Sequence, residues 1–285
     1  MIKHWIITGD THGRVVSRIG NISRNYPDYE PSETAIIILG DAGINFYLNK
    51  SDKKNKAAIN SLGYHIYCVR GNHEERPQKI PDMLVNYDKN VQGLVYLEKE
   101  YPLIKYFQDG GIYRIKNHSC LVIGGAYSVD KYWRLQRAAA EGSSFSGWFE
   151  GELLTQEEME RIEFLTKEKE FDFILTHTCP TSFEPRDLFL DCVDQSTVDK
   201  SMEEFLEKIK NETDWKIWCF GHFHADRVEH LGVEQFYYGY EEIDTIWNRW
   251  NTTAFEDEEY LHLDKSPFME HYCSWINGKE EPISE

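Results

Sequence analysis

Short apolar runs that end in metal-binding side chains constrain the fold of this chain more than any other feature. The first run covers residues 1–8 and is followed by Asp10 and His12. The later runs, each with the side chains that follow it, are residues 35–39 with Asp41, 65–69 with Asn72 and His73, 171–176 with His177, and 215–220 with His222 and His224. Polar, helix-compatible stretches at 15–26 and 52–62 separate the first three runs. This alternation predicts an α/β protein with mostly parallel strands, whose chemistry lies beyond the carboxyl ends of the strands.

The residue types at these strand ends suit a metal site. A lone Asp-x-His triplet is weak support, because an aspartate turn cap beside a surface histidine is common. Burying such groups costs free energy unless a partner compensates them, and a divalent metal is one such partner. A mixture of carboxylate, amide and imidazole ligands suits manganese, iron, nickel or zinc, whereas an all-oxygen cage suits calcium or magnesium. The candidate metal ligands are Asp10, His12, Asp41, Asn72, His177, His222 and His224.

This set is larger than one closed site needs, since a structural zinc ion takes four ligands. A surplus of ligands around one central carboxylate indicates two metals that share it. Two ions about 3.5–4 Å apart clamp a phosphate and turn a bridging water into hydroxide. The expected cofactor is therefore a pair of divalent metal ions. We favour manganese over iron, nickel or zinc.

The motifs in which these residues occur resemble a known superfamily. They are GDTHG at residues 9–13, GD at 40–41, GNHE at 71–74, the lone His177 after a strand, and GHFH at 221–224. In this order they resemble the calcineurin-like metallophosphoesterases, and they extend over most of the chain. The resemblance implies a four-layer αββα sandwich of two mixed sheets, with a dinuclear metal site at the strand ends. The loop at 125–134 looks like a segment of uncharacterised bacterial and phage members.

The resemblance also implies a role for each site residue. Asp10, His12 and His224 would hold one metal, while Asn72, His177 and His222 would hold the other, with Asp41 bridging the two. His73 would be catalytic rather than a ligand, placed over the substrate phosphate to protonate the leaving oxygen or to stabilise charge. An unperturbed imidazole has a pKa near neutrality, which suits a general acid.

The second motif departs from the protein phosphatases of this superfamily, which continue it as G-D-x-V-D-R-G. Here Ile44 and Asn45 replace the second aspartate and the arginine. An assignment as a eukaryotic-type protein phosphatase is therefore in doubt. Arg76 and Arg134 are the candidates for substrate binding, because an arginine fork matches phosphate geometry. An ordinary surface salt bridge explains either residue equally well.

The rest of the chain is expected to form one domain with an appendage. Residues 153–169 and 198–210 read as helices, the first with Thr155 as its N-cap, and 228–240 reads as a strand pair. The phosphoesterase domain is expected to span residues 1–240. Residues 241–285 are acidic and rich in tryptophan, and we expect them to pack on the same domain.

Charge and composition exclude several classes of protein. The formal net charge of −18 disfavours long duplex nucleic acid as a partner. No apolar run approaches the roughly 18 to 20 residues of a membrane span, and no signal peptide is recognisable, so we expect a cytoplasmic protein. The expected substrate is a phosphorylated small molecule, a nucleotide or a phosphoprotein, as a monoester or a diester. The alternatives are a metal-retaining scaffold protein that acts through residues 241–285, or a nuclease or cyclic nucleotide phosphodiesterase.

Overall fold

The computed structural model describes residues 1–229 and 232–251, and in these the first three apolar runs form neighbouring parallel strands. Ile and Val dominate these runs, and both faces of the strands are buried, as parallel strands covered on both sides require. The seven-stranded sheet has the order β13-β1-β2-β3-β6-β5-β4. Its strands are β1 (His4–Thr8), β2 (Thr34–Leu39), β3 (His65–Val69), β4 (Met83–Asp88), β5 (Gly93–Glu98), β6 (Ile104–Phe107) and β13 (Tyr240–Glu242).

A second, six-stranded sheet contains the two later apolar runs as parallel neighbours, in the order β11-β12-β10-β9-β8-β7. Its strands are β7 (Gly111–Ile115), β8 (His118–Ile123), β9 (Glu170–Thr176), β10 (Asp214–Phe220), β11 (Arg227–Glu229) and β12 (Val233–Gln235). Strands β8, β9, β10 and β12 run parallel, whereas β7 and β11 pair antiparallel with their neighbours. The sheet is therefore mixed, like the first.

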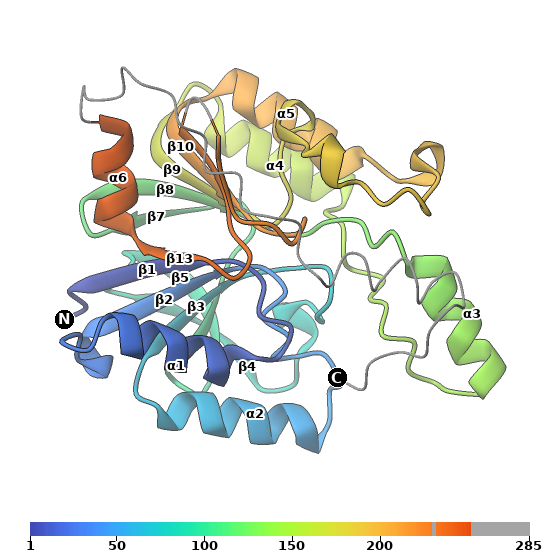
Figure 1. Ribbon diagram of the computed structural model, residues 1–285, viewed down its shortest axis with the longest axis horizontal. Coiled ribbons are helices and arrows are strands. Elements are labelled where there is room, and N and C mark those ends of the chain that lie inside the picture. Colours follow the sequence, from blue (N-terminus) through green and yellow to red (C-terminus); the bar gives the residue numbers. More distant parts are fainter. Residues whose placement is uncertain (230–231, 252–285) are drawn as a thin grey trace.

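The two sheets lie face to face, and helices cover their outer faces (Figure 1). The helices are α1 (Val15–Asn25), α2 (Lys50–Ser61), α3 (Lys131–Glu141), α4 (Gln156–Thr166), α5 (Ser201–Glu212) and α6 (Ile243–Asn251). Helices α1 and α2 lie on the first sheet, and α4 and α5 lie on the second (Figure 1). Short 3-10 helices span Pro31–Glu33, Pro77–Lys79, Thr181–Phe183, Arg186–Leu188 and Gln195–Thr197.

Alternation along the strands builds the core of each layer. Ile6 of β1 packs among the helix-side residues Ile19 and Ile22 of α1, whereas the next residue, Ile7, packs between the sheets. Successive strand residues point to opposite faces, so one strand contributes to two cores. On the other side, Ile174 packs in the core between the second sheet and the helices α4 and α5. The predicted four-layer αββα sandwich with two mixed sheets is confirmed.

Helix α4 begins where its sequence predicts. The Thr155 side chain accepts a hydrogen bond from the Glu158 N–H, and the Glu158 carboxylate accepts one from the Thr155 N–H. This capping box satisfies two amide groups that the first helical turn leaves unpaired. The predicted helix at 198–210 begins slightly later, at Ser201.

The expected boundary between residues 240 and 241 falls inside a strand. Strand β13 spans it and pairs antiparallel with β1, so residues 241–251 belong to the sandwich itself. Helix α6 follows, and its Trp247 and Trp250 pack against the core between the sheets. Residues 252–285, the remainder of the acidic, tryptophan-rich segment, lie outside the described residues.

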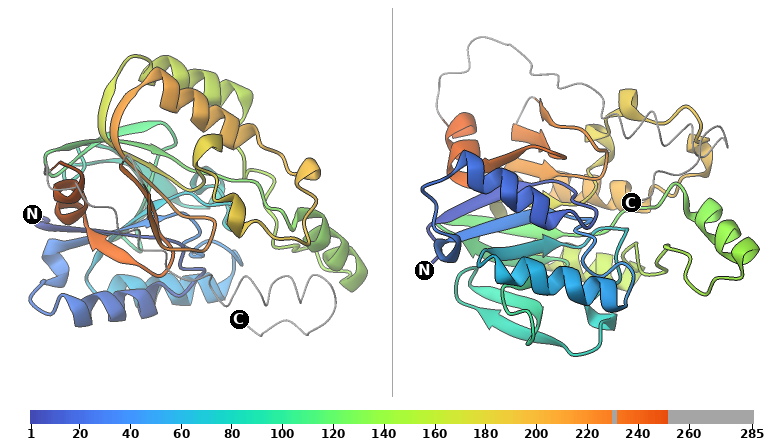
Figure 2. Two further views of the ribbon diagram at one scale, coloured as in Figure 1. Left: turned by 45° about the horizontal axis from the view of Figure 1, so that its top comes forward. Right: turned by 60° about the horizontal axis from the view of Figure 1, so that its bottom comes forward.

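The segment at 125–134, expected as a loop, is a loop only as far as Asp130. Helix α3 begins at Lys131 and ends at Glu141, and the left-handed backbone of its C-cap residue Gly142 (φ +65°) suits a helix C-terminus. The helix stands out from the sandwich in both views of Figure 2. No helix in the described ranges is long and apolar enough to cross a membrane.

Candidate metal centre

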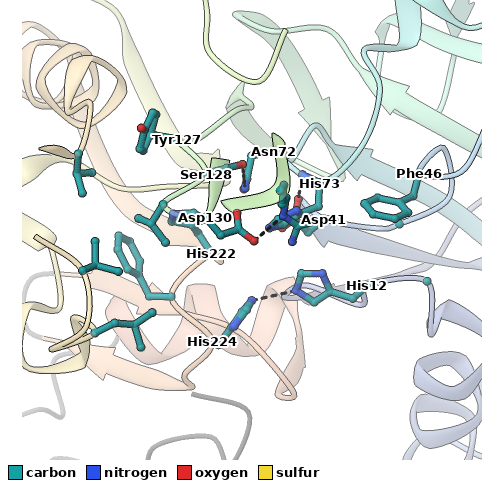
Figure 3. A pocket seen from close by; sticks show the side chains of 18 of the residues that line it. His12, Asp41, Phe46, Asn72, His73, Tyr127, Ser128, Asp130, His222 and His224 are labelled. Atoms are coloured by element: carbon teal, nitrogen blue, oxygen red, sulfur yellow. Dashed lines mark hydrogen bonds and ion pairs between the residues drawn. The ribbon is translucent and has the colours of Figure 1, made fainter. Parts of the chain in front are cut away.

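The seven predicted ligands lie together at one edge of the sandwich, where five strands from both sheets end. Asp10 and His12 follow β1, Asp41 follows β2, Asn72 and His73 follow β3, His177 follows β9, and His222 and His224 follow β10. Figure 3 shows several of these side chains turned toward a common space. Residues up to 212 positions apart in the sequence therefore meet, because the carboxyl ends of parallel strands lie at the same edge of a sheet.

The first group of donors consists of Asp10, His12 and His224. The Nε2 atoms of His12 and His224 lie 2.9 Å apart, so the two rings face each other through the nitrogens that bind metals (Figure 3). Oδ2 of Asp10 lies 3.4 Å from His224 Nε2 and 3.8 Å from His12 Nε2. This buried oxygen has no hydrogen-bond partner among the described residues. A buried carboxylate oxygen without a partner is costly, and a cation between these three side chains would compensate it.

The second group contains Asn72, His177 and His222. Oδ1 of Asn72 lies 2.8 Å from Nε2 of His177, whose Nδ1 donates a hydrogen bond to the Leu39 carbonyl at 2.8 Å. A histidine held in this way presents Nε2 to a metal in a fixed orientation. The rings of His177 and His222 lie 5.0 Å apart. Burial and the neighbouring His177 lower the pKa of His222 to about 3, so its ring is neutral, as a metal ligand must be.

Asp41 lies between the two groups. Its Oδ1 accepts a hydrogen bond from the His73 backbone N–H at 2.8 Å and lies 3.5 Å from His177 Nε2. One oxygen of Asp41, one of Asp10 and one nitrogen of His177 lie within 4.8 Å of one another. Both carboxylates are almost fully buried. Asp41 thus lies near one member of each group, Asp10 and His177, and the bridging role that the resemblance implies stays a prediction.

The electrostatics of this cluster favour positive charge. Burial alone would raise the pKa of Asp41, but the nearby His177 and His73 hold it well below its ordinary value. Burial alone would lower the pKa of His177, but Asp41 and Asp10 raise it to about 9. A proton on His177 partly compensates the negative charge of the two carboxylates, and a divalent cation would compensate it more fully. The residues present therefore fit a metal centre.

Backbone strain is concentrated at the same residues. His12, Asp41, His222 and His224 all have positive φ angles, from 42° to 67°. Residues other than glycine rarely adopt this left-handed backbone conformation. When they do, they are often at functional sites, where the surrounding structure imposes it. The surrounding fold thus holds four of the candidate ligands in an unfavourable backbone conformation.

Glycines at the strand ends leave room for the candidate ligands of neighbouring strands. A Cβ atom on Gly40 would lie 2.0 Å from His177 Nδ1, and one on Gly71 would lie 2.0 Å from Asp41 Oδ1. A Cβ on Gly221 would lie 2.3 Å from Asp10 Oδ1. The glycine of each motif therefore permits contact between strands as well as a turn.

Ser128 and Glu152 orient Asn72, and sequence reasoning did not identify them. The Asn72 Nδ2 group donates a hydrogen bond to Ser128 Oγ at 2.9 Å, and Ser128 Oγ donates one to Glu152 Oε2 at 2.5 Å. Because the amide nitrogen is bound in this way, the Asn72 oxygen faces His177. The only signal in the sequence is that Ser128 lies in a loop dense in polar and aromatic groups.

His73 lies next to the candidate ligands and lines the cavity in front of them. Its Nε2 is 4.0 Å from Asp41 Oδ2. Burial and the Arg134 guanidinium lower the pKa of His73 to about 4. In the protein without metal ions, the pKa of His73 therefore lies below that of an unperturbed imidazole. A bound phosphate would add negative charge beside the ring and raise this pKa again.

The two arginine candidates have different environments. Arg134 lines the cavity, where its Nε donates to Asp130 Oδ2 at 2.5 Å. Arg76 is absent from the cavity lining among the described residues. Its guanidinium contacts Glu158 at 2.6 and 3.1 Å and donates to the carbonyls of Gly151 and Leu153. These contacts tie the start of α4 to the GNHE loop and give Arg76 a structural role, so substrate binding by Arg76 stays a prediction that this geometry disfavours.

The departures in the second motif have structural uses. Ile44 is fully buried in the core beneath α1. Asn45 accepts a hydrogen bond from Lys56 Nζ at 3.0 Å and donates one to the Tyr106 hydroxyl at 3.4 Å. Neither side chain is placed to assist His73 in the way an acidic partner would. The chain therefore uses these positions for packing.

A cavity of about 440 Å³ opens in front of the candidate ligands. The donor set beside this cavity makes the αββα sandwich a candidate metal-binding protein. The match of the family sequence profile to residues 4–226 makes the class specific: the chain belongs to the calcineurin-like phosphoesterase family. It is therefore a hydrolase of phosphoester bonds that depends on divalent metal ions. No sequence among the curated proteins matches this chain.

Proposed function

We propose that the chain hydrolyses phosphate monoesters or diesters with two divalent metal ions. Asp10, His12 and His224 would hold one ion, and Asn72, His177 and His222 would hold the other, with Asp41 shared between them. The observation that carries this proposal is that Asp10 belongs to two clusters of possible ligand atoms, one with His12 and His224 and one with Asp41 and His177, and that its buried Oδ2 has no hydrogen-bond partner among the described residues. When bound, the ions would neutralise phosphate charge and supply hydroxide near neutral pH, and manganese is the ion we favour.

The protein groups around the centre would orient the substrate and manage its proton. In the reaction, water adds across a P–O bond and releases an alcohol and a phosphate or phosphate monoester. His73 would donate a proton to the departing alcohol oxygen, since a bound phosphate would raise its pKa. Arg134, which is close enough to His73 to lower its pKa, would bind a phosphate oxygen.

The other classes of function have less support. A scaffold protein acting through residues 241–285 is disfavoured for residues 241–251, because β13 and α6 are part of the sandwich. A nuclease acting on long duplexes conflicts with the net charge of −18. Small phosphoesters are therefore the substrates we favour.

The proposal is tested by removing and restoring metal. The purified protein should contain divalent metal, lose turnover of p-nitrophenyl phosphate or bis-p-nitrophenyl phosphate after chelation, and regain it with Mn²⁺. The ratio of the two rates separates a phosphatase from a phosphodiesterase. Metal content by mass spectrometry and product absorbance are the measurements. Absence of bound metal and of turnover with Mn, Fe, Ni and Zn would refute the proposal.

A second prediction concerns His73. His73→Ala should lower kcat by about 10²- to 10⁴-fold, the usual contribution of general acid catalysis. Metal content should be unchanged, because the hydrogen bond to Asp41 comes from the backbone of residue 73. Steady-state kinetics and metal analysis of the same sample check both points. Loss of metal in this variant would show that His73 is itself a ligand.

A further inference from the structure

The cavity in front of the metal centre is larger than a phosphate group needs. Its volume of about 440 Å³ lies within the range of pockets that enclose whole organic ligands. One side of it consists of hydrocarbon side chains, which we call the apolar wall. The apolar wall comprises Leu188, Phe189, Leu190, Val193, Val198 and Phe223. Its chemistry carries information about the organic part of the substrate.

The apolar wall begins directly beside the candidate ligands. Phe223 lies between His222 and His224 in the sequence, and its ring centroid is 4.9 Å from that of His222. The Phe189 ring is 6.2 Å from the Phe223 ring, and the two planes differ by only 19°. Both rings line the cavity. A group attached to a phosphate at the metal centre would therefore meet aromatic surface without leaving the cavity.

Three polar side chains, Gln195, Lys200 and Glu203, also line the cavity near the apolar wall. Glu203 accepts a hydrogen bond from Thr178 Oγ1 at 2.7 Å through Oε1, while its buried Oε2 has no hydrogen-bond partner among the described residues. Lys200 donates a hydrogen bond to Glu184 at 2.8 Å, and its Nζ lies 4.7 Å from the centroid of the Phe189 ring. Gln195 donates to the Val193 carbonyl at 3.5 Å. A sugar placed against the six side chains of the apolar wall would exchange water for hydrocarbon at most of its hydroxyl groups, which is costly. An apolar group placed there would gain by leaving water.

The opposite side of the cavity is different in character. Figure 3 shows Phe46 across the polar groups from Tyr127 and His222. The ring of Phe46 lies 4.8 Å from that of Tyr47, which also lines the cavity, and the lining further includes the polar side chains of Arg14, Ser51 and Asn55. The cavity thus has one side suited to hydrocarbon and one side of mixed polarity. This asymmetry would select the orientation as well as the type of the bound ester.

We propose that the apolar wall binds the alcohol component of the substrate, and that this component is a flat, apolar group such as an aryl ring. The inference rests on the proposed phosphoesterase function and narrows its substrate class. It disfavours sugar phosphates and phosphoserine or phosphothreonine peptides, whose alcohol components are polar or small. Leu190 and Val193 would then determine specificity, because they would contact the organic group and are not candidate metal ligands.

The test uses phosphonates, which resemble phosphoesters but are not hydrolysed. Calorimetric titration of the Mn²⁺-loaded protein with phenylphosphonate, methylphosphonate and 2-hydroxyethylphosphonate compares three groups on one anion. We expect phenylphosphonate to bind at least about tenfold more tightly than either of the others. The double variant Leu190→Asn/Val193→Thr should reduce this preference to about threefold or less, because it places polar atoms in the wall at similar volume. The matched control Val85→Thr, on exposed strand β4, should keep the full preference.

Each outcome bears on this inference separately from the proposed function. Equal binding of the three phosphonates, or an unchanged preference in the double variant, would overturn the assignment of the apolar wall even if the protein hydrolyses p-nitrophenyl esters. If phenylphosphonate binds preferentially and the double variant abolishes this preference, the assignment of the apolar wall is supported even if no ester is turned over. Circular dichroism of the double variant against Val85→Thr shows whether it is folded. If it is not, Val193→Thr alone gives the same comparison.

Discussion

Asp41→Asn should abolish turnover while leaving the fold intact. The asparagine side chain has the same shape, and its oxygen can still accept the His73 N–H at the position of Oδ1. The change removes the negative charge that lies between the two groups of candidate ligands. We expect kcat/KM to fall by at least about 100-fold, because even substitutions that only support a metal ligand cost 10- to 100-fold. The affinity for Mn²⁺ should fall with it.

Thermal unfolding with and without Mn²⁺ measures this effect independently of activity. Binding to the folded state alone raises the melting temperature, so Mn²⁺ should stabilise the wild type much more than the variant. Asp88→Asn is the matched control, since Asp88 is also buried and charged but pairs with Lys105 outside the cavity lining. It should lower stability and retain the response to Mn²⁺. An Asp41→Asn protein with normal metal content and normal rate would rule out the bridging role.

The residues that come together at the metal centre were readable from the sequence because each follows a strand signal of its own. A parallel strand of Ile and Val is a local pattern, and the edge at which its carboxyl end lies follows from the topology. His12 and His224 illustrate this, since they are remote in the chain and their Nε2 atoms lie 2.9 Å apart. The four-layer sandwich was predictable for a different reason, the resemblance of the ordered motifs to a known superfamily.

The contacts that support the centre were not readable, because loops determine them. Ser128, which accepts a hydrogen bond from Asn72, lies in a segment whose sequence has no periodic pattern. Glu152, which accepts a hydrogen bond from Ser128, lies further along the chain. Arg76 follows the GNHE motif closely, yet Glu158 and two carbonyls bind its guanidinium. Which partner an arginine finds depends on tertiary packing. Sequence spacing does not encode it.

The pKa of His73 was also not readable from the sequence. The expectation near neutrality used the value of an imidazole in water, whereas burial and the charge of Arg134 lower the pKa to about 4. Both causes come from tertiary structure. Four residues of the apolar wall, Leu188, Phe189, Leu190 and Val193, lie in a segment of 3-10 turns, bends and irregular backbone for which the sequence predicted no element.

Gly40→Ala should be among the most damaging single-methyl changes in the chain. Gly40 has a φ of +93°, and a Cβ atom there would lie 2.0 Å from Nδ1 and 2.3 Å from Cγ of His177. The ring cannot move aside easily, because it is fully buried and Nδ1 donates a hydrogen bond to the Leu39 carbonyl. Backbone strain of about 1–2 kcal/mol and overpacking of about 1–3 kcal/mol should together lower the free energy of unfolding by about 3 kcal/mol or more. Metal binding should fall as well, since His177 is displaced.

Gly142→Ala separates the two causes of this loss. Gly142 also has a positive φ, +65°, but a Cβ atom there would have no heavy atom within 4 Å. This variant should therefore lose only the backbone contribution, about 1 kcal/mol, and should bind Mn²⁺ normally. Urea denaturation of the metal-free proteins measures the first quantity, and calorimetric titration with Mn²⁺ measures the second. Similar losses of stability in the two variants would mean that His177 yields to the added methyl group. The close packing of Gly40 against His177 would then not be what holds the ring in place.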